Sequence, residues 1–279
     1  MRMRSLLFVP GDRPERMKKA RDLNADVLIL DLEDSVTAAR KDDARKAVAD
    51  SLGEPRPVPV FVRVNPAASL MEQDLAGIMP GRPDGIMLPK AEGGASVASV
   101  ARRLDALGDK NTRILPIATE TPAAIFALGT YGHVTDRLCG LTWGAEDLPS
   151  AIGATTAREP DGSFTAPYQM VRSLALFAAH AAGVAAIETV YPALKDEQGL
   201  MDYAMRARRD GFSGMLAIHP AQLAIIHTAF TPSKEDAAWA QRVVEAFAAH
   251  PNAGALQIDG QMMDAPHLKL AQRILTSTS

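Results

Sequence analysis

Cysteine is almost absent from this 279-residue sequence, which contains Cys139 and no other. Neither an intramolecular disulfide nor a cysteine-based zinc cluster can therefore form. A reducing compartment suits such a chain better than an oxidising one. Because Cys139 falls within a predicted strand, we expect it to serve as a small buried hydrophobic residue.

Long hydrophobic runs and a strong net charge are also missing. No apolar run reaches the roughly 18 residues that a membrane-spanning helix requires, and the start, Met1-Arg2-Met3-Arg4, lacks the apolar core of a signal peptide. A formal net charge of -3 provides no basic field for a nucleic acid. We therefore expect a cytoplasmic protein that binds neither membranes nor nucleic acids. The basic segment at residues 13–21 is either a solvated helix face or a phosphate clamp, and the first is favoured for most of its charges.

The sequence does contain a regular alternation of apolar runs and helix-like stretches. Eight such runs, each followed by a helical stretch, predict an α/β fold of the (β/α)8 or TIM barrel type. Near-continuous apolar runs such as Val27-Leu28-Ile29-Leu30 indicate strands buried on both faces, as in a parallel sheet covered by helices. The runs lie at residues 5–10, 26–33, 59–65, 85–90, 113–120, 138–147, 185–191 and 214–220.

The chain length indicates one main domain with a small addition. A barrel needs about 250 residues, so we expect a barrel catalytic domain at residues 1–230 and a C-terminal helical arm or lid at residues 231–279. Within the barrel, helices are predicted at residues 14–23, 41–52, 95–107 and 166–182, and residues 148–164 are predicted to form a rim or lid loop. In the arm, a helix from about Ser233 to His250 precedes an Asp259-Gly260 turn and a break at Pro266, which indicate an ordered segment.

Polar residues fall at the downstream ends of the apolar runs, and in a (β/α)8 barrel these ends form the active-site face. Glu120 ends the fifth run and Asp147 ends the sixth, so their carboxylates are predicted to meet at strand tips about 4.8 Å apart. A shared cation would relieve their repulsion. Two carboxylates completed by water or substrate oxygens suit Mg²⁺, with Mn²⁺ as a substitute. The spacing leaves open the alternative that one carboxylate pairs with an arginine at the rim.

Two basic residues are predicted to lie at the same face of the barrel as Glu120 and Asp147. Arg63 interrupts an apolar strand, and its guanidinium could bind a carboxylate or a developing enolate oxygen. An ion pair with Asp31 or Glu33 of the preceding strand is as well supported. Lys90 could form a Schiff base, but a metal site nearby makes covalent catalysis redundant, so electrostatic orientation of the substrate is favoured.

Six motifs occur in order along nearly the whole chain. They are LLFVPGDRPERM (residues 6–17), ILDLEDSV (29–36), VRVN (62–65), LPK (88–90), GAEDL (144–148) and AIHPAQ (217–222). Together they resemble the citrate lyase beta subunit-like proteins of the HpcH/HpaI aldolase superfamily.

This resemblance implies a barrel lyase that breaks or makes a carbon–carbon bond between an acyl thioester, usually of coenzyme A, and a 2-oxo acid, with Mg²⁺. The family's metal-binding glutamate and aspartate match Glu120 and Asp147, and Glu120 is also expected beside the substrate. Its substrate-binding arginine matches Arg63. In malyl- and citramalyl-coenzyme A lyase relatives, a C-terminal acidic residue acts as acid or base from a neighbouring subunit. Asp264 fits that pattern, which implies a homo-oligomer, a trimer or hexamer. Glu188 stands where relatives commonly have aspartate, a departure that bears on the acyl-chain or rim contacts.

The expected function is Mg²⁺-dependent cleavage or formation of a 3-hydroxyacyl-coenzyme A, such as malyl- or citramalyl-coenzyme A, which yields acetyl-coenzyme A and a 2-oxo acid. Asp264 and Arg63 are the expected catalytic residues, and Arg63, Glu120 and Lys90 the expected substrate contacts. Two alternatives stay open: the beta subunit of a citrate lyase complex acting on citryl-acyl carrier protein, and a malyl-coenzyme A thioesterase. The choice among glyoxylate, pyruvate and oxaloacetate depends on loop shape, which the sequence does not fix.

Overall fold

The computed structural model describes residues 1–278, and the chain divides into two compact units, Met1–Ile226 and a second that begins at His227. The first unit holds the large sheet, and the second holds two helices and a hairpin. The sequence placed a domain boundary after residue 230, which is the end of helix α9 (Gln222–Phe230). That helix runs across the division at Ile226.

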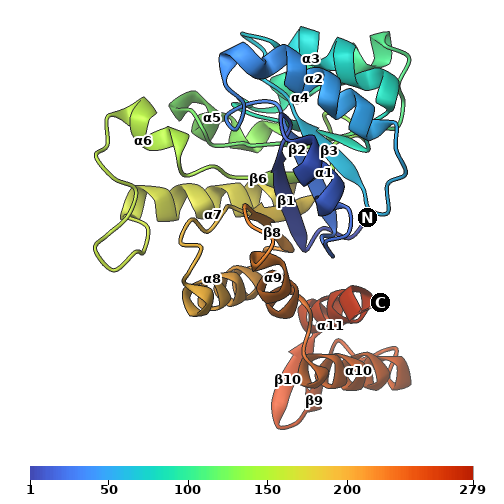
Figure 1. The fold of residues 1–279 in the computed structure, drawn as a ribbon. Helices are drawn as coiled ribbons and strands as arrows, with labels where there is room; N and C mark the ends of the chain where they lie inside the picture. The colour runs from blue at the N-terminus through green and yellow to red at the C-terminus, as the bar shows by residue number, and fades with distance from the viewer. Residues whose placement is uncertain (279) are drawn as a thin grey trace. The chain divides into compact units, whose positions relative to one another are not determined.

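The first unit is a barrel of eight parallel strands, which confirms the predicted fold (Figure 1). The strand order is β5-β4-β3-β2-β1-β8-β7-β6, so strands that are consecutive in sequence lie side by side. Parallel bridges from Ile114 to Leu138 and from Ile117 to Thr142 close the barrel between β5 and β6. The strands are β1 (Ser5–Pro10), β2 (Val27–Asp31), β3 (Val60–Arg63), β4 (Gly85–Leu88), β5 (Arg113–Pro116), β6 (Gly140–Thr142), β7 (Ala185–Glu188) and β8 (Gly214–Ala217).

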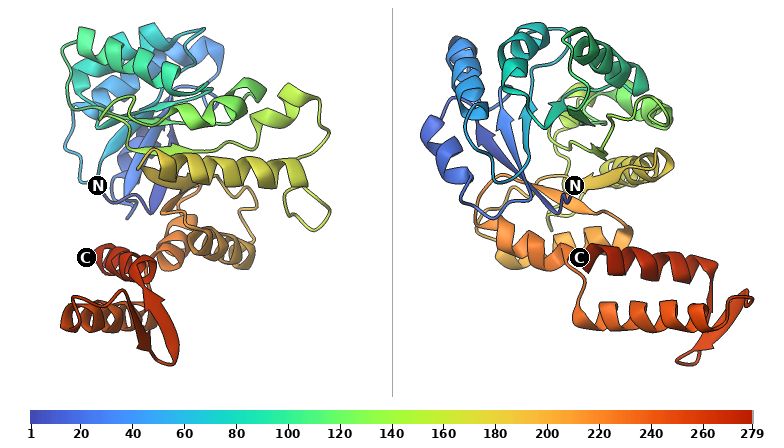
Figure 2. Two further views of the ribbon diagram at one scale, coloured as in Figure 1. Left: turned by 180° about the vertical axis from the view of Figure 1, so that it is seen from behind. Right: turned by 90° about the vertical axis from the view of Figure 1, so that its right-hand side faces the viewer.

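Helices alternate with the strands and surround them, as the right-hand view of Figure 2 shows. Helix α2 begins and ends at the predicted residues, and α1, α4 and α7 differ from prediction by one to three residues at an end. None of the helices in the described part of the chain combines the length and hydropathy needed to cross a bilayer. The helices before α9 are α1 (Pro14–Ala20), α2 (Lys41–Leu52), α3 (Met71–Ile78), α4 (Gly94–Ala106), α5 (Pro122–Ala127), α6 (Asp147–Ile152), α7 (Ala166–Ala181) and α8 (Glu197–Asp210).

Apolar side chains from the strands fill the barrel interior, so it is a packed core rather than a pore. One cluster includes Leu6, Phe61 and Leu115, each fully buried. A Cβ atom at Gly85 would lie 2.5 Å from the Phe61 ring, so glycine is required where that ring crosses β4. Cys139 lies just before β6 instead of within it, and it packs against this cluster as a partly buried residue.

A buried carboxylate connects β7 to the elements packed around it. Glu188, at the end of β7, accepts hydrogen bonds from Trp143 Nε1 at 2.5 Å, Arg172 Nε at 2.7 Å and the Tyr203 hydroxyl at 2.8 Å. These partners come from the residue after β6, from α7 and from α8. Glu188 is fully buried, so this residue, which departs from the family pattern, is a structural anchor in this chain.

The second unit has its own small core. Helix α10 (Lys234–Ala249) begins at a capping box in which Ser233 and Asp236 satisfy each other's backbone N–H groups. A hairpin of β9 (Ala255–Ile258) and β10 (Gln261–Asp264) turns at Asp259-Gly260, both with positive φ, and leads into α11 (Ala265–Thr278). Pro266 therefore lies in the first turn of a helix, where a missing N–H costs nothing, and the break expected there is wrong. Val243, Phe247 and Met263 pack together in this unit.

Candidate active site

A cavity of about 440 Å³ opens at the carboxyl ends of the barrel strands. Three of the four residues that were predicted from the sequence at this face line the cavity, namely Arg63, Glu120 and Asp147. The fourth, Lys90, contacts both carboxylates from the side. The lining residues are Phe8, Pro10, Arg16, Asp31, Asp34, Ser35, Arg63, Ile117, Glu120, Trp143, Gly144, Ala145, Glu146, Asp147, Thr189, Val190, Leu216 and Ile218.

Glu120 follows β5 and is almost entirely buried. Its Oε2 accepts a hydrogen bond of 2.5 Å from the Lys90 backbone N–H. Burial raises the pKa of Glu120 to about 8, and repulsion from the carboxylates of Glu33 and Asp147 adds to the shift, which the Lys90 N–H only partly opposes. A bound cation would offset both the burial and the repulsion and favour the ionised carboxylate.

Asp147 does not end a strand, contrary to the sequence prediction. Strand β6 stops at Thr142, and Asp147 is the first residue of α6. The segment between them is held to the end of β5, because Thr119 Oγ1 donates to the Gly144 carbonyl at 3.1 Å and accepts from the Gly144 N–H at 3.0 Å. A Cβ atom at Gly144 would lie 2.9 Å from Glu120 Cγ, so this glycine lets the two acidic residues line the same cavity.

Lys90 supplies a cation beside the carboxylates. It follows β4 with a φ of 50°, and this left-handed conformation accompanies the N–H bond to Glu120. Its Nζ lies 2.9 Å from Glu33 Oε1 and 3.4 Å from Asp147 Oδ1. Burial alone would lower the pKa of Lys90, but the hydrogen bond to Glu33 and the surrounding carboxylates outweigh it and raise the pKa above the usual range. A protonated amine is no nucleophile, so the geometry favours electrostatic orientation over a Schiff base.

Arg63 takes part in an ion pair and also lines the cavity. Its Nε and Nη2 each donate to Asp31 at 2.7 Å, and its Nη1 lies 3.1 Å from both Glu33 Oε2 and Asp34 Oδ2. Burial would raise the pKa of Asp31, but the hydrogen bonds and charge of Arg63 outweigh burial and lower it. A guanidinium has five N–H groups, and the three hydrogen bonds to Asp31 and Asp34 use three of them. The remaining N–H groups can serve a ligand in the cavity.

The donor set fits Mg²⁺. Mg²⁺ is commonly held by one or two carboxylates, with water or substrate oxygens at the remaining positions, and Glu120 and Asp147 line one cavity. Among residues 1–278, no cluster of three or more histidine, cysteine or acidic side chains competes as a metal site.

One wall of the cavity is apolar and was not predicted from the sequence. Phe8, Trp143 and Leu216 line it, and the Trp143 indole N–H is held by buried Glu188. Trp143 directly precedes the GAEDL motif, which is the signal that could have identified it. Arg16, from the basic segment at residues 13–21, also reaches the cavity lining.

Asp264 belongs to the second unit, where it is the last residue of β10. Its Oδ1 lies 2.6 Å from His267 Nδ1, and about two fifths of each side chain is exposed. Its assignment to the catalytic machinery stays a prediction.

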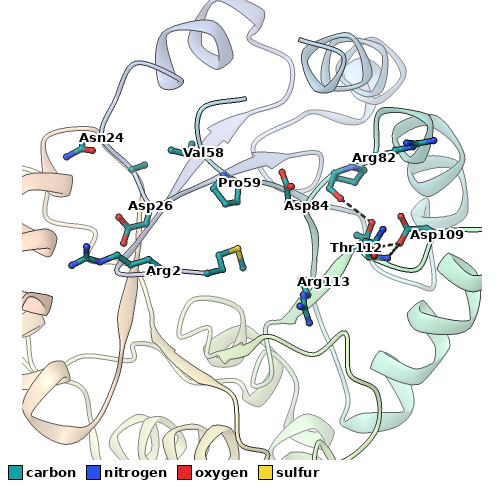
Figure 3. Close-up of a pocket in the computed structure, with 14 residues that line it drawn as sticks. Arg2, Asn24, Asp26, Val58, Pro59, Arg82, Asp84, Asp109, Thr112 and Arg113 are labelled. Atoms are coloured by element: carbon teal, nitrogen blue, oxygen red, sulfur yellow. Dashed lines mark hydrogen bonds between the residues drawn. The ribbon is translucent and has the colours of Figure 1, made fainter. Parts of the chain in front are cut away.

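A larger hollow, of about 610 Å³, lies at the opposite end of the barrel (Figure 3). Its acidic residues already have partners: Asp26 pairs with Arg4 at 2.8 Å, Asp109 with Arg137 at 3.0 Å, and Asp84 accepts from the Val60 N–H at 2.8 Å. This hollow is formed at the amino ends of the strands, where barrels carry stabilising contacts rather than catalytic groups.

The fold agrees with what comparison with known proteins shows. The model of the HpcH/HpaI aldolase/citrate lyase family matches residues 4–220, and the chain belongs to this family. The predicted resemblance is thereby confirmed.

Curated relatives align along almost the whole chain. A citrate lyase subunit beta-like protein of Mycobacterium tuberculosis is 37% identical over 270 residues, which cover 96% of this chain and 93% of the relative. The citrate lyase subunit beta of Escherichia coli K12 is 32% identical, covering 98% and 92%. The human mitochondrial citramalyl-CoA lyase is also 32% identical, covering 98% and 84%. These relatives confirm the predicted class, a carbon–carbon lyase.

A solved structure is similar over the full length. The CitE protein of M. tuberculosis, in complex with magnesium, acetoacetate and coenzyme A, superposes with a TM-score of 0.83 at 35% identity, covering 99% of this chain and 97% of that one. The predicted combination of Mg²⁺ and a coenzyme A thioester agrees with the content of that complex.

Proposed function

We propose that this protein is a Mg²⁺-dependent lyase that acts on a 3-hydroxyacyl-coenzyme A, such as malyl- or citramalyl-coenzyme A. It cleaves this compound into acetyl-coenzyme A and a 2-oxo acid, or forms it from them. The observation that carries the proposal is the cavity at the carboxyl ends of the strands, lined by Glu120, Asp147 and Arg63. The human citramalyl-CoA lyase and the magnesium and coenzyme A complex of CitE support it.

Glu120 and Asp147 would hold the metal ion in this proposal. When bound, Mg²⁺ supplies Lewis-acid stabilisation of negative charge on substrate oxygens. The Lys90 N–H fixes the orientation of the Glu120 carboxylate, and the Lys90 ammonium contacts Asp147 from the side. Both carboxylates are therefore oriented by the protein.

Arg63 binds the oxo acid end of the substrate. Its fork is held by Asp31, so its remaining N–H groups point with little freedom, and a fixed donor aimed at developing charge is worth more than a mobile one. The apolar wall around Trp143 limits the water that can compete for the charged groups.

Asp264 acts as the general acid or base from a neighbouring copy of the chain. In the cleavage direction it gives a proton to the α-carbon of the departing thioester enolate, and in the synthetic direction it removes that proton. Helix α7 offers a surface for association of copies, because Met170, Leu174 and Phe177 recur on its outer face and are 58%, 38% and 66% exposed. A homo-oligomer, trimer or hexamer, is part of this proposal.

The beta subunit of a citrate lyase complex is a second candidate, favoured by the E. coli relative, whose identity equals that of the human lyase. It predicts turnover of citryl-acyl carrier protein and little turnover of free coenzyme A esters. A thioesterase would release free thiol after condensation.

The test incubates purified protein and Mg²⁺ with acetyl-coenzyme A and glyoxylate, pyruvate or oxaloacetate, and identifies products by mass spectrometry. A 3-hydroxyacyl-coenzyme A that disappears with chelator is the expected product. Glu120→Gln and Asp147→Asn should abolish both turnover and Mg²⁺ binding by calorimetry, whereas the exposed Glu197→Gln on α8 should change neither. Turnover that persists in chelator or in both variants would refute the proposal.

A further inference from the structure

Asp264 and His267 form a close pair where β10 passes into α11. His267 Nδ1 lies 2.6 Å from Asp264 Oδ1, and the same nitrogen lies 3.2 Å from the Asp264 backbone nitrogen. Both side chains are partly exposed, 41% for Asp264 and 42% for His267. The pair therefore combines a tight contact with access from outside.

The two contacts compete for the same nitrogen, because Nδ1 either carries a hydrogen or accepts one. If Nδ1 carries the hydrogen, it donates to Asp264 Oδ1 across the 2.6 Å contact, and Oδ1 can accept it whether or not Oδ2 carries a proton. An Nδ1 without a hydrogen would instead accept from the Asp264 backbone N–H across the longer contact of 3.2 Å. The shorter contact favours donation from Nδ1 to Oδ1, which leaves Nε2 outside this bond.

We propose that His267 is a positioning residue for Asp264 in the lyase reaction, an inference that rests on the proposed function. Within the described part of the chain, Oδ1 has His267 as its partner and Oδ2 has none. In the cleavage direction, the O–H bond at Oδ2 breaks, its proton forms a C–H bond at the enolate α-carbon, and Asp264 is left as a carboxylate. The His267 hydrogen bond stabilises that carboxylate and fixes which oxygen faces the substrate.

A purely structural role for His267 makes different predictions. His267 is three residues after Asp264, the spacing at which a side chain can accept the N–H that begins a helix. In that case His267 would act as an acceptor, Nδ1 would carry no proton, and its loss would lower the stability of the second unit without a specific effect on turnover.

The experiment measures kcat and KM for the full-length protein and the variants Asp264→Asn, His267→Ala and His267→Asn. The Asn side chain places an N–H near the position of Nδ1, so it retains the donor. His250→Asn is the matched control, because His250 also lies in the second unit and its imidazole contacts the Ala246 carbonyl rather than a carboxylate. Circular dichroism at the assay temperature measures the folded fraction of each variant.

We expect His267→Ala to lower kcat by about tenfold or more, with KM within about twofold of wild type, and His267→Asn to restore most of the loss. Asp264→Asn should lower kcat by at least about 10²-fold with Mg²⁺ binding intact. Unchanged kcat in His267→Ala, no rescue by His267→Asn, or a loss matched by the folded fraction would overturn the role of His267.

A nitrogen-15 imidazole spectrum provides a readout that needs no turnover. The His267 signals, identified from their absence in His267→Ala, should show a protonated Nδ1, and a neutral ring protonated only at Nε2 would overturn the proposal. If wild-type protein turns over none of the tested substrates, the proposed function fails, and the spectrum still decides the geometry of the pair.

Discussion

Arg63 shows how one side chain serves stability and ligand binding together. It pairs with buried Asp31 through two hydrogen bonds of 2.7 Å and also lines the cavity. The sequence raised both roles as alternatives because the interruption of an apolar strand by arginine is compatible with either. The structure contains the ion pair and the exposure to the cavity at once, so the alternatives were not exclusive.

Replacing Arg63 with lysine should impair both roles. A lysine retains the charge but not the planar fork, so we expect kcat/KM to fall by at least about 10²-fold and the unfolding temperature to fall as well. Steady-state kinetics and thermal unfolding check both effects. Arg102→Lys, an exposed substitution on α4, is the control and should alter neither kcat/KM nor the unfolding temperature. Wild-type activity in Arg63→Lys would show that the guanidinium is not needed for substrate recognition.

Asp31 should make stability depend on acidity in a defined direction. Its folded-state pKa lies below the usual 3.8 because the bonds and charge of Arg63 outweigh burial. The unfolded chain then takes up the proton first as pH falls, so the stabilisation is complete above about pH 5 and is lost as pH falls through 3.8 and below.

The unfolding temperature of wild type should accordingly drop more steeply between about pH 5 and pH 3 than that of Asp31→Asn. Burial raises the pKa of neighbouring Glu33, an opposite effect that is common to both proteins. Parallel curves would show that Asp31 does not titrate below its usual range.

At the scale of elements, the segment from β6 to α6 determines whether the two carboxylates share a cavity. Gly144 allows it, because any side chain there would press on Glu120 Cγ at 2.9 Å. We expect Gly144→Ala to weaken Mg²⁺ binding by about tenfold or more, with only a small loss of stability, because the neighbour that must shift is Glu120 itself.

Calorimetric titration with Mg²⁺ measures this effect. Gly132→Ala is the matched control, since a Cβ atom there meets nothing within 4 Å. Equal affinity in Gly144→Ala and wild type would mean that Glu120 is not a ligand or that its carboxylate moves freely.

The same segment marks where sequence reasoning about elements fails. Apolar runs predicted all eight strands because burial on both faces leaves a clear pattern. They did not predict that β6 ends at Thr142 and that Asp147 begins a helix, since Trp143 and Ala145 continue the apolar pattern after the sheet has ended. Glu120 and Asp147 were nevertheless predicted as a pair, because the order of strands around a barrel fixes which loops are neighbours.

For the molecule as a whole, the oligomer proposal makes a quantitative prediction. If Asp264 completes the site of a neighbouring copy, co-expression of Glu120→Gln with Asp264→Asn should restore activity, although each variant alone is inactive. Random assembly joins an intact barrel to an intact Asp264 in about a quarter of the sites. No recovery in co-purified mixed oligomers would mean that barrel and Asp264 come from the same chain.

Most of the architecture could be predicted at this scale, because eight alternating strand and helix units have few compact arrangements. The packing partners of individual polar residues could not. The sequence showed Glu188 only as a departure from the aspartate of relatives. The fold brings Trp143, Arg172 and Tyr203 from separate elements around it. Likewise, the sequence places His267 three residues after Asp264, but the contact between them depends on how the hairpin enters the helix.

Lys90 gives the barrel a resident counter-charge. Its ammonium lies against Glu33 and Asp147, so part of the negative charge at the cavity is compensated without an external ion. We therefore expect that removal of divalent ions abolishes activity but leaves the protein folded, and that activity returns when Mg²⁺ is added back. Activity and thermal unfolding, measured before chelation, after it and after readdition of Mg²⁺, test this expectation. Such a protein can fold before it meets the metal ion it uses. A transient shortage of Mg²⁺ would then stop turnover without loss of the folded protein.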